Sequence, residues 1–135
     1  MKAWTIMLLA FSLPIVAMAE ESKEGDAGKV AYVSLSPALV GNYGLDGGPK
    51  LHVYKADIAL RVTGADAEKS VRHNEPLIRN QLVALFAQQT VDDMNSVEAK
   101  EKLRQEALKQ TRQVMNDEEG KPVVEDLLFN NLIIQ

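Results

Sequence analysis

The chain has 135 residues, a formal net charge of −4 and no cysteine. This length predicts one domain with a hydrophobic core of its own. The absence of cysteine excludes disulfides, thiolate metal ligands and a lipid-modified cysteine anchor. The 15 Lys and Arg are outnumbered by 19 Asp and Glu and form no block. Nucleic acid is therefore excluded as a partner, because phosphate binding needs clustered positive charge.

The first 19 residues have the pattern of a secretory signal peptide. Lys2 precedes an apolar run, Pro14 interrupts that run near its end, and the small residues Ala17 and Ala19 stand where a signal peptidase cleaves. The pattern predicts export and cleavage between Ala19 and Glu20. The alternative is a short membrane anchor, since the apolar run reaches the lower edge of the roughly 17–25 residues that span a bilayer.

The remainder of the chain divides into a short leader and a domain. Residues 20–29 are polar, contain glycine and lack large apolar side chains, which predicts a flexible leader. Residues 30–135 carry the apolar patterns of a folded domain. No internal repeat or low-complexity segment interrupts them.

Three stretches of the domain have the patterns of strands. Residues 30–40 are rich in β-branched and aromatic side chains, and Pro37 indicates an edge or a bend. Residues 41–49 are rich in Gly and predict a turn. Residues 51–62 alternate between apolar and polar side chains, which predicts a half-buried strand. Residues 123–134 predict a final strand. The apolar side of the second strand is predicted to be His52, Tyr54, Ala56, Ile58, Leu60 and Val62.

The middle of the domain has helical patterns. Residues 65–73 predict a short helical segment, and Pro76 is well placed in the first turn of a longer helix. Ser96 is a predicted N-cap for an amphipathic helix over residues 97–115, and residues 116–122 predict a turn. The buried stripe of the first long helix is predicted to be Leu77, Ile78, Leu82, Leu85 and Phe86.

The opposite side of that helix is unusually apolar for a solvated face. It carries the small residues Val83, Ala84 and Ala87. One interpretation is that the rest of the domain buries the helix on both sides. The other is that Val83, Ala84 and Ala87 form a subunit contact. The order of elements predicts an α+β domain in which two main helices pack on one face of a small sheet.

No arrangement of residues in the chain has the pattern of a catalytic, metal or cofactor site. The two histidines, His52 and His73, have no second ligand at zinc spacing and no nucleophile beside them in sequence. The acidic runs 92–93 and 117–119 lack the alternating order of a calcium loop, and no phosphate-binding loop occurs. By elimination the sequence indicates a non-enzymatic binding or structural protein without a cofactor.

Read in order, the motifs of residues 32–135 resemble the FliL family of flagellar basal-body-associated proteins. Residues 32–37 (YVSLSP) and 51–60 (LHVYKADIAL) are similar to the first two strands of the family, and residues 73–79 (HNEPLIR) to its entry into the first long helix. The second helix of the family is similar to Lys102 to Glu106 and Asn116. Its last strand is similar to residues 124–129 (VEDLLF) together with Ile133 to Gln135.

The resemblance implies a stomatin-like α+β domain in the periplasm, associated with the inner membrane or the flagellar basal body. It implies the stator units and the basal body as partners, a homo-oligomeric ring, and a role in stator engagement, torque and swarming motility. It implies no enzyme activity. On this reading Val83, Ala84 and Ala87 become candidates for the contact between subunits.

The N-terminus departs from the family pattern. Family members carry a longer cytoplasmic segment and a long single membrane anchor, where this chain has one Lys and a signal-peptide-like run. The departure leaves two ways of placing the domain, by an uncleaved short anchor or by contacts of the folded region alone. The alternative to a FliL-like role is an unrelated exported periplasmic domain with a binding or chaperone-like function.

Overall fold

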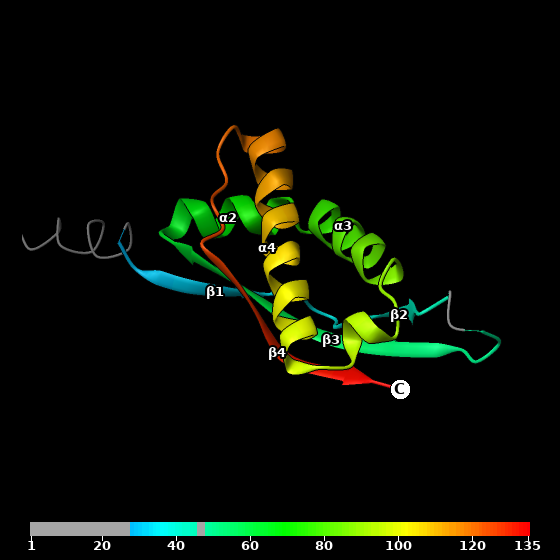
Figure 1. Cartoon of the computed structure of the whole chain (residues 1–135). Helices are drawn as coiled ribbons and strands as arrows, with labels where there is room; N and C mark the ends of the chain where they lie inside the picture. Colours follow the sequence, from blue (N-terminus) through cyan, green and yellow to red (C-terminus); the bar gives the residue numbers. More distant parts are fainter. Residues whose placement is uncertain (1–27, 46–47) are drawn as a thin grey trace, which may run out of the picture.

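The computed structural model describes residues 28–45 and 48–135. The predicted signal peptide, its cleavage point between Ala19 and Glu20, and most of the predicted leader lie outside the described residues. The described chain forms a sheet whose one face is covered by helices (Figure 1). Its elements are β1 (Val30–Ser34), β2 (Leu39–Tyr43), β3 (His52–Thr63), α2 (Ala65–His73), α3 (Glu75–Ala87), the 3-10 turn η1 (Asp92–Met94), α4 (Val97–Glu119) and β4 (Asp126–Ile134).

The sheet is built around β3, its longest strand. β1 and β2 both pair antiparallel with β3 along the same edge, each with a different half of it. They are two parts of one extended segment that is interrupted at the cis Ser36–Pro37 bond, as Pro37 predicts. β4 pairs antiparallel along the other edge, where Asn130 is the extra residue of a bulge. β2 and β3 are thus consecutive strands, whereas β4, the last strand of the chain, pairs with β3 from far away in sequence.

The alternation along β3 decides which face of the sheet is the core. Tyr54, Ala56, Ile58, Leu60 and Val62 are buried under the helices, as predicted, and His52 is half-buried. The intervening polar side chains, among them Lys55, Asp57 and Arg61, are on the other face. One covered face and one partly polar face are typical of an antiparallel sheet.

Aromatic side chains form the centre of the core between α3 and the sheet. Phe86 of α3 stacks on Tyr54 of β3 with ring centroids 4.6 Å apart and meets Phe129 of β4 edge-on at 6.0 Å. Ile78 and Leu82 of the same helix are fully buried. The helices α2, α3 and α4 cover one face of a small antiparallel sheet, so the predicted α+β fold is confirmed (Figure 1).

Four local predictions were wrong in detail. The final strand was predicted from residue 123 but begins at Asp126. α4 continues through Glu119 and ends at Gly120, whose φ of 76° is the left-handed conformation that stops a helix, so the turn predicted from residue 116 begins later. β2 continues to Tyr43, inside the segment predicted as a turn. Leu77 was predicted in the buried stripe of α3, but its side chain is 44% exposed. Within the part of the chain that the structure describes, no helix has the length and apolar character needed to cross a bilayer.

Candidate functional site: the two sides of α4

α4 is fixed at both ends, which places the surfaces on either side of it. The Ser96 hydroxyl accepts the Ala99 backbone N–H at 3.0 Å, and this is the predicted N-cap. At the other end the Asn74 side-chain amide, between α2 and α3, donates to the Glu119 carboxylate at 2.7 Å. Along its length Arg112 Nη1 donates to the Val124 carbonyl at 2.6 Å. The C-terminal half of α4 therefore lies between α3 and the returning segment 120–125 (Figure 1).

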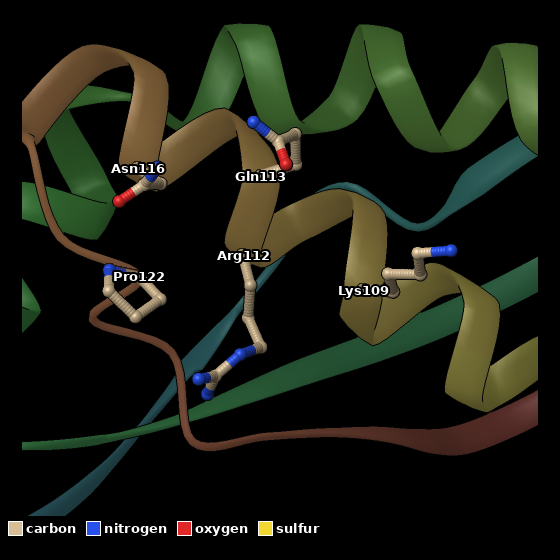
Figure 2. Close-up of a pocket in the computed structure, with 5 residues that line it drawn as sticks. All are labelled: Lys109, Arg112, Gln113, Asn116 and Pro122. Atoms are coloured by element: carbon tan, nitrogen blue, oxygen red, sulfur yellow. The ribbon is translucent and has the colours of Figure 1, made fainter.

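A hollow of about 330 Å³ opens on the side of α4 that meets this returning segment. We call it the basic hollow. Figure 2 shows Arg112 reaching from α4 toward the strands, beside the Pro122 ring of the returning segment. Two lining side chains are cations, two more are amides, and no carboxylate is among them. The Gln113 amide donates to the Asp117 carboxylate, one turn further along α4, at 2.8 Å. The basic hollow is lined by Lys109, Arg112, Gln113, Asn116 and Pro122.

A second hollow, of about 270 Å³, opens on the α3 side of α4. We call it the acidic hollow. It carries the carboxylates of Asp117 and Glu118 and no cationic side chain, together with the exposed Leu77. Below it the Gln81 amide donates to Gln110 at 2.8 Å and joins the two helices. The acidic hollow is lined by Leu77, Asn80, Gln81, Val114, Asp117 and Glu118.

The outward side of α3 continues from the acidic hollow. Val83, Ala84 and Ala87 are all exposed, with Val83 at 40%. The interpretation that the rest of the domain buries this side is therefore wrong for the described residues. Ala84 follows Asn80 by one helical turn, so the two side chains share one side of α3. The subunit contact at Val83, Ala84 and Ala87 stays a prediction.

Ion pairs and hydrogen bonds perturb few of the titratable groups. The hydrogen bonds from Arg104, and then from Gln105, lower the pKa of Glu101 to about 2. The Glu101 carboxylate in turn raises the pKa of Arg104, and the Thr90 backbone N–H lowers the pKa of Asp93. All of these groups lie near the N-terminal half of α4 or the loop before it, away from both hollows.

The arrangement provides no constellation for catalysis or metal binding among the described residues. His52 is half-buried with its ring 5.3 Å from that of Tyr43, and His73 is exposed at the end of α2. In the ranges 28–45 and 48–135, no cluster of three or more His, Asp or Glu side chains could hold a metal ion. What the arrangement offers is surface: two open hollows of opposite charge and an exposed apolar helix side.

The family model for the flagellar basal body-associated protein FliL matches residues 32–135. The chain belongs to the FliL family. The match covers every strand and helix of the domain apart from the first two residues of β1, so both hollows and the outward side of α3 are parts of the FliL fold. A search among curated proteins gives no match. FliL proteins are flagellar components associated with the basal body, and this chain is one of them.

Both hollows are absent from the sequence predictions. Residues 109, 112, 113 and 116 follow the i, i+3, i+4, i+7 spacing of one helix side, and all four can donate hydrogen bonds. That signal was available in the sequence. Residue 116 was predicted in the turn after the helix, and the returning segment that closes the hollow is known only from the fold.

Proposed function

We propose that this FliL-family protein is a non-enzymatic flagellar component that acts in the periplasm, beside the inner membrane, and supports the engagement of stator units and motility. The observation that carries the proposal is the family match across the whole domain. The signal-peptide-like N-terminus supports export of that domain. The absence of a cysteine suits a domain held together by its core alone.

The surface of the domain supports a scaffold rather than an enzyme. Both hollows are open, and their lining residues include no nucleophile with a base beside it. The exposed apolar side of α3 is a surface of the kind that contacts between proteins use. Within this proposal, Val83, Ala84 and Ala87 contribute to a contact between subunits of a homo-oligomeric ring.

The function is tested by deleting the gene and restoring it on a plasmid. We expect the deletion to reduce swimming torque and swarming, and a fluorescent fusion of the full chain to collect at flagellar basal bodies only when stator proteins are present. Intact motility in the deletion strain, with the fusion spread evenly through the periplasm, would contradict the proposal. That result would favour an unrelated exported binding or chaperone-like domain.

The mode of attachment has a separate test. Mass spectrometry of the N-terminus of protein recovered from fractionated cells distinguishes a chain that begins at Glu20 from one that keeps its first 19 residues. We expect Glu20 as the first residue. A full-length chain confined to the membrane fraction would instead show that the apolar run is an anchor.

The subunit contact is tested by Val83→Glu, which places a charge on the exposed apolar side of α3. We expect the variant to fold, because Val83 is 40% exposed, and to lose both oligomers and motility. Ser34→Glu is a matched control, because this exposed residue adds the same charge on the opposite face of the sheet. If Val83→Glu leaves the oligomeric state and motility unchanged, the contact lies elsewhere.

A further inference from the structure

We infer that the basic hollow and the acidic hollow are the two halves of one contact between copies of this chain. The basic hollow of one copy receives the acidic rim, Asp117 and Glu118, of the next copy. The inference rests on the proposed assembly of this FliL-family domain and assigns the surfaces that it uses. A second copy is the partner because the chain itself carries both members of a complementary pair.

The charges of the two hollows are complementary and are not mixed within either one. The basic hollow is lined by two cations and no carboxylate, in a chain whose net charge is −4. The acidic hollow is lined by two carboxylates and no cation. Separation of the two signs onto different surfaces favours association of the unlike surfaces and disfavours contact between like ones.

The positions of the hollows on α4 decide the type of contact. With about 100° per residue, the α4 side chains of the basic hollow and those of the acidic hollow point roughly 140° apart around the helix axis. A two-fold contact that joined the unlike surfaces would do so twice, so both surfaces of one copy would have to face the same partner, which sides of α4 about 140° apart do not allow. The unlike surfaces meet only head to tail, and repetition of such a contact closes into a ring or continues as a filament.

Apolar side chains beside the acidic hollow add area to the contact. Leu77 and Val83 of α3 are 44% and 40% exposed, and the exposed Ala84 follows Val83 directly in the helix. On the complementary surface, Pro122 is exposed beside the cations. A small apolar surface next to complementary charges resembles the composition of protein interfaces more than that of a solvated helix. The predicted subunit contact of α3 thus becomes the apolar part of the same interface.

Internal hydrogen bonds hold both hollows in shape before any partner binds. Arg112 is fixed by the Val124 carbonyl at 2.6 Å, and the Gln81–Gln110 bond at 2.8 Å joins α3 to α4 under the acidic hollow. The Asn74–Glu119 bond at 2.7 Å ties down the last turn of α4. Side chains that are already ordered lose less entropy on association, which favours binding.

The inference is tested by disulfide trapping, because the chain has no native cysteine to interfere. Two full-length single-cysteine variants are co-expressed in the oxidising periplasm, Asn116→Cys in the basic hollow and Asn80→Cys in the acidic hollow. Both substitutions keep every charge. We expect a disulfide-linked dimer from the mixture and none from either variant alone, because a head-to-tail contact brings residue 116 only to residue 80. Asn42→Cys, exposed on the open face of the sheet, is the matched control.

A charge exchange gives the second arm. Lys109→Glu in the Asn116→Cys chain is expected to abolish the mixed dimer, and adding Glu118→Lys to the Asn80→Cys chain is expected to restore it. Neither Lys109 nor Glu118 makes a side-chain hydrogen bond or ion pair within the described chain. Chains that carry Lys109→Glu or Glu118→Lys should therefore fold, which circular dichroism checks.

Each result has one meaning. A mixed dimer no more abundant than with Asn42→Cys, a dimer from one hollow variant alone, or trapping of a different protein would each overturn the inference. Loss of trapping while basal-body localisation and motility persist leaves the proposed function standing and removes only this interface. Loss of basal-body localisation while trapping persists would leave the interface standing and contradict the proposed function.

Discussion

Arg104 of α4 and Asp126 of β4 form an ion pair with 2.7 Å between Nη1 and Oδ1. The same nitrogen donates to the Leu127 carbonyl at 3.0 Å, and the rest of the guanidinium donates to Glu101 at 2.6 and 2.9 Å. The Arg104 side chain is only 19% exposed. One side chain thus holds the longest helix to the edge strand of the sheet through two acceptors of β4, while Glu101 of α4 itself orients the guanidinium.

Arg104→Lys is expected to destabilise the protein nearly as much as Arg104→Ala. An ammonium is a point charge and cannot reach Glu101, Asp126 and the Leu127 carbonyl with the fork geometry of a guanidinium. We expect each variant to lower the free energy of unfolding by about 1.5–3 kcal/mol, the range for hydrogen bonds to charged groups. Urea unfolding of the full chain measures this loss of stability.

A matched control for Arg104 is Arg72→Lys. Arg72 pairs with Glu68 along α2 at 3.0 Å, but its side chain is 53% exposed and reaches no strand. We expect a change of less than about 1 kcal/mol there, because exposed ion pairs contribute little. Equal effects at both arginines would show that the link from α4 to β4 contributes no more than an ordinary surface pair.

The Glu101 carboxylate is expected to contribute to acid denaturation. Arg104 first, and Gln105 second, lower its pKa from 4.5 to about 2. Because the folded pKa is depressed, the stabilisation is complete above about pH 4.5 and is lost as the pH falls through about 2. Glu101→Gln should therefore be less stable than the wild type at pH 7, and the difference should close between pH 4.5 and 2.

Unfolding midpoints at a series of pH values measure that difference. Asp92→Asn is the control, since the exposed Asp92 has no ion-pair partner among the described residues and belongs to neither hollow. A gap between wild type and Glu101→Gln that stays constant down to pH 2 would mean that the Glu101–Arg104 pair is not what the acid breaks.

Val123 is expected to tolerate glycine better than alanine. It has a φ of 54°, and its neighbours close a three-residue turn through the Val124 N–H and the Pro122 carbonyl at 2.5 Å. A β-branched residue in the left-handed region costs about 1–2 kcal/mol. Val123→Gly and Val123→Ala lose similar packing, so we expect Gly to be more stable than Ala by about 1 kcal/mol.

The comparison site for Val123 is Val40, which is 62% exposed in β2. There the backbone is extended, and the order should reverse, with Ala more stable than Gly by about 0.5–1 kcal/mol. Thermal unfolding of the four variants measures the order of stability of Gly and Ala at each site. The same order of stability at both sites would show that the turn stores no strain at Val123.

Local patterns predicted the parts of the fold that depend on local physics. The period of two along β3 identified its buried side, because successive side chains of a strand must point to opposite faces. Ser96 identified the start of α4, because a hydroxyl satisfies a free N–H of the first turn. These signals require no knowledge of which elements become neighbours.

The errors arose where distant segments decide the outcome. Leu77 follows the spacing of the buried stripe, but it lies at the edge between α3 and α4, where the two helices leave the acidic hollow open. The polar residues 116–119 were predicted as a turn, but they continue α4 until Gly120 provides the left-handed stop. Both hollows need two segments that the fold brings together, so composition and period could not show them.

Gly41 of β2 and Tyr54 of β3 are cross-strand partners. A Cβ at Gly41 would lie 2.8 Å from the Tyr54 hydroxyl oxygen and 3.0 Å from Cε1. Tyr54 cannot withdraw, since its ring stacks on Phe86 at 4.6 Å. Gly41→Ala is therefore expected to cost about 1–3 kcal/mol, the range for overpacking in a core.

Tyr54→Phe should stabilise the protein, whereas Gly41→Ala should destabilise it. The Tyr54 hydroxyl is buried without a hydrogen-bond partner among the described residues, and burial raises its pKa. Removing an unsatisfied buried hydroxyl is expected to raise the free energy of unfolding by about 1 kcal/mol. In the Tyr54→Phe background Gly41→Ala should cost less, although the ring contact at 3.0 Å keeps some of the cost. A double-mutant cycle measures the coupling, and effects that add to within about 0.5 kcal/mol would show that the hydroxyl is not the clashing atom.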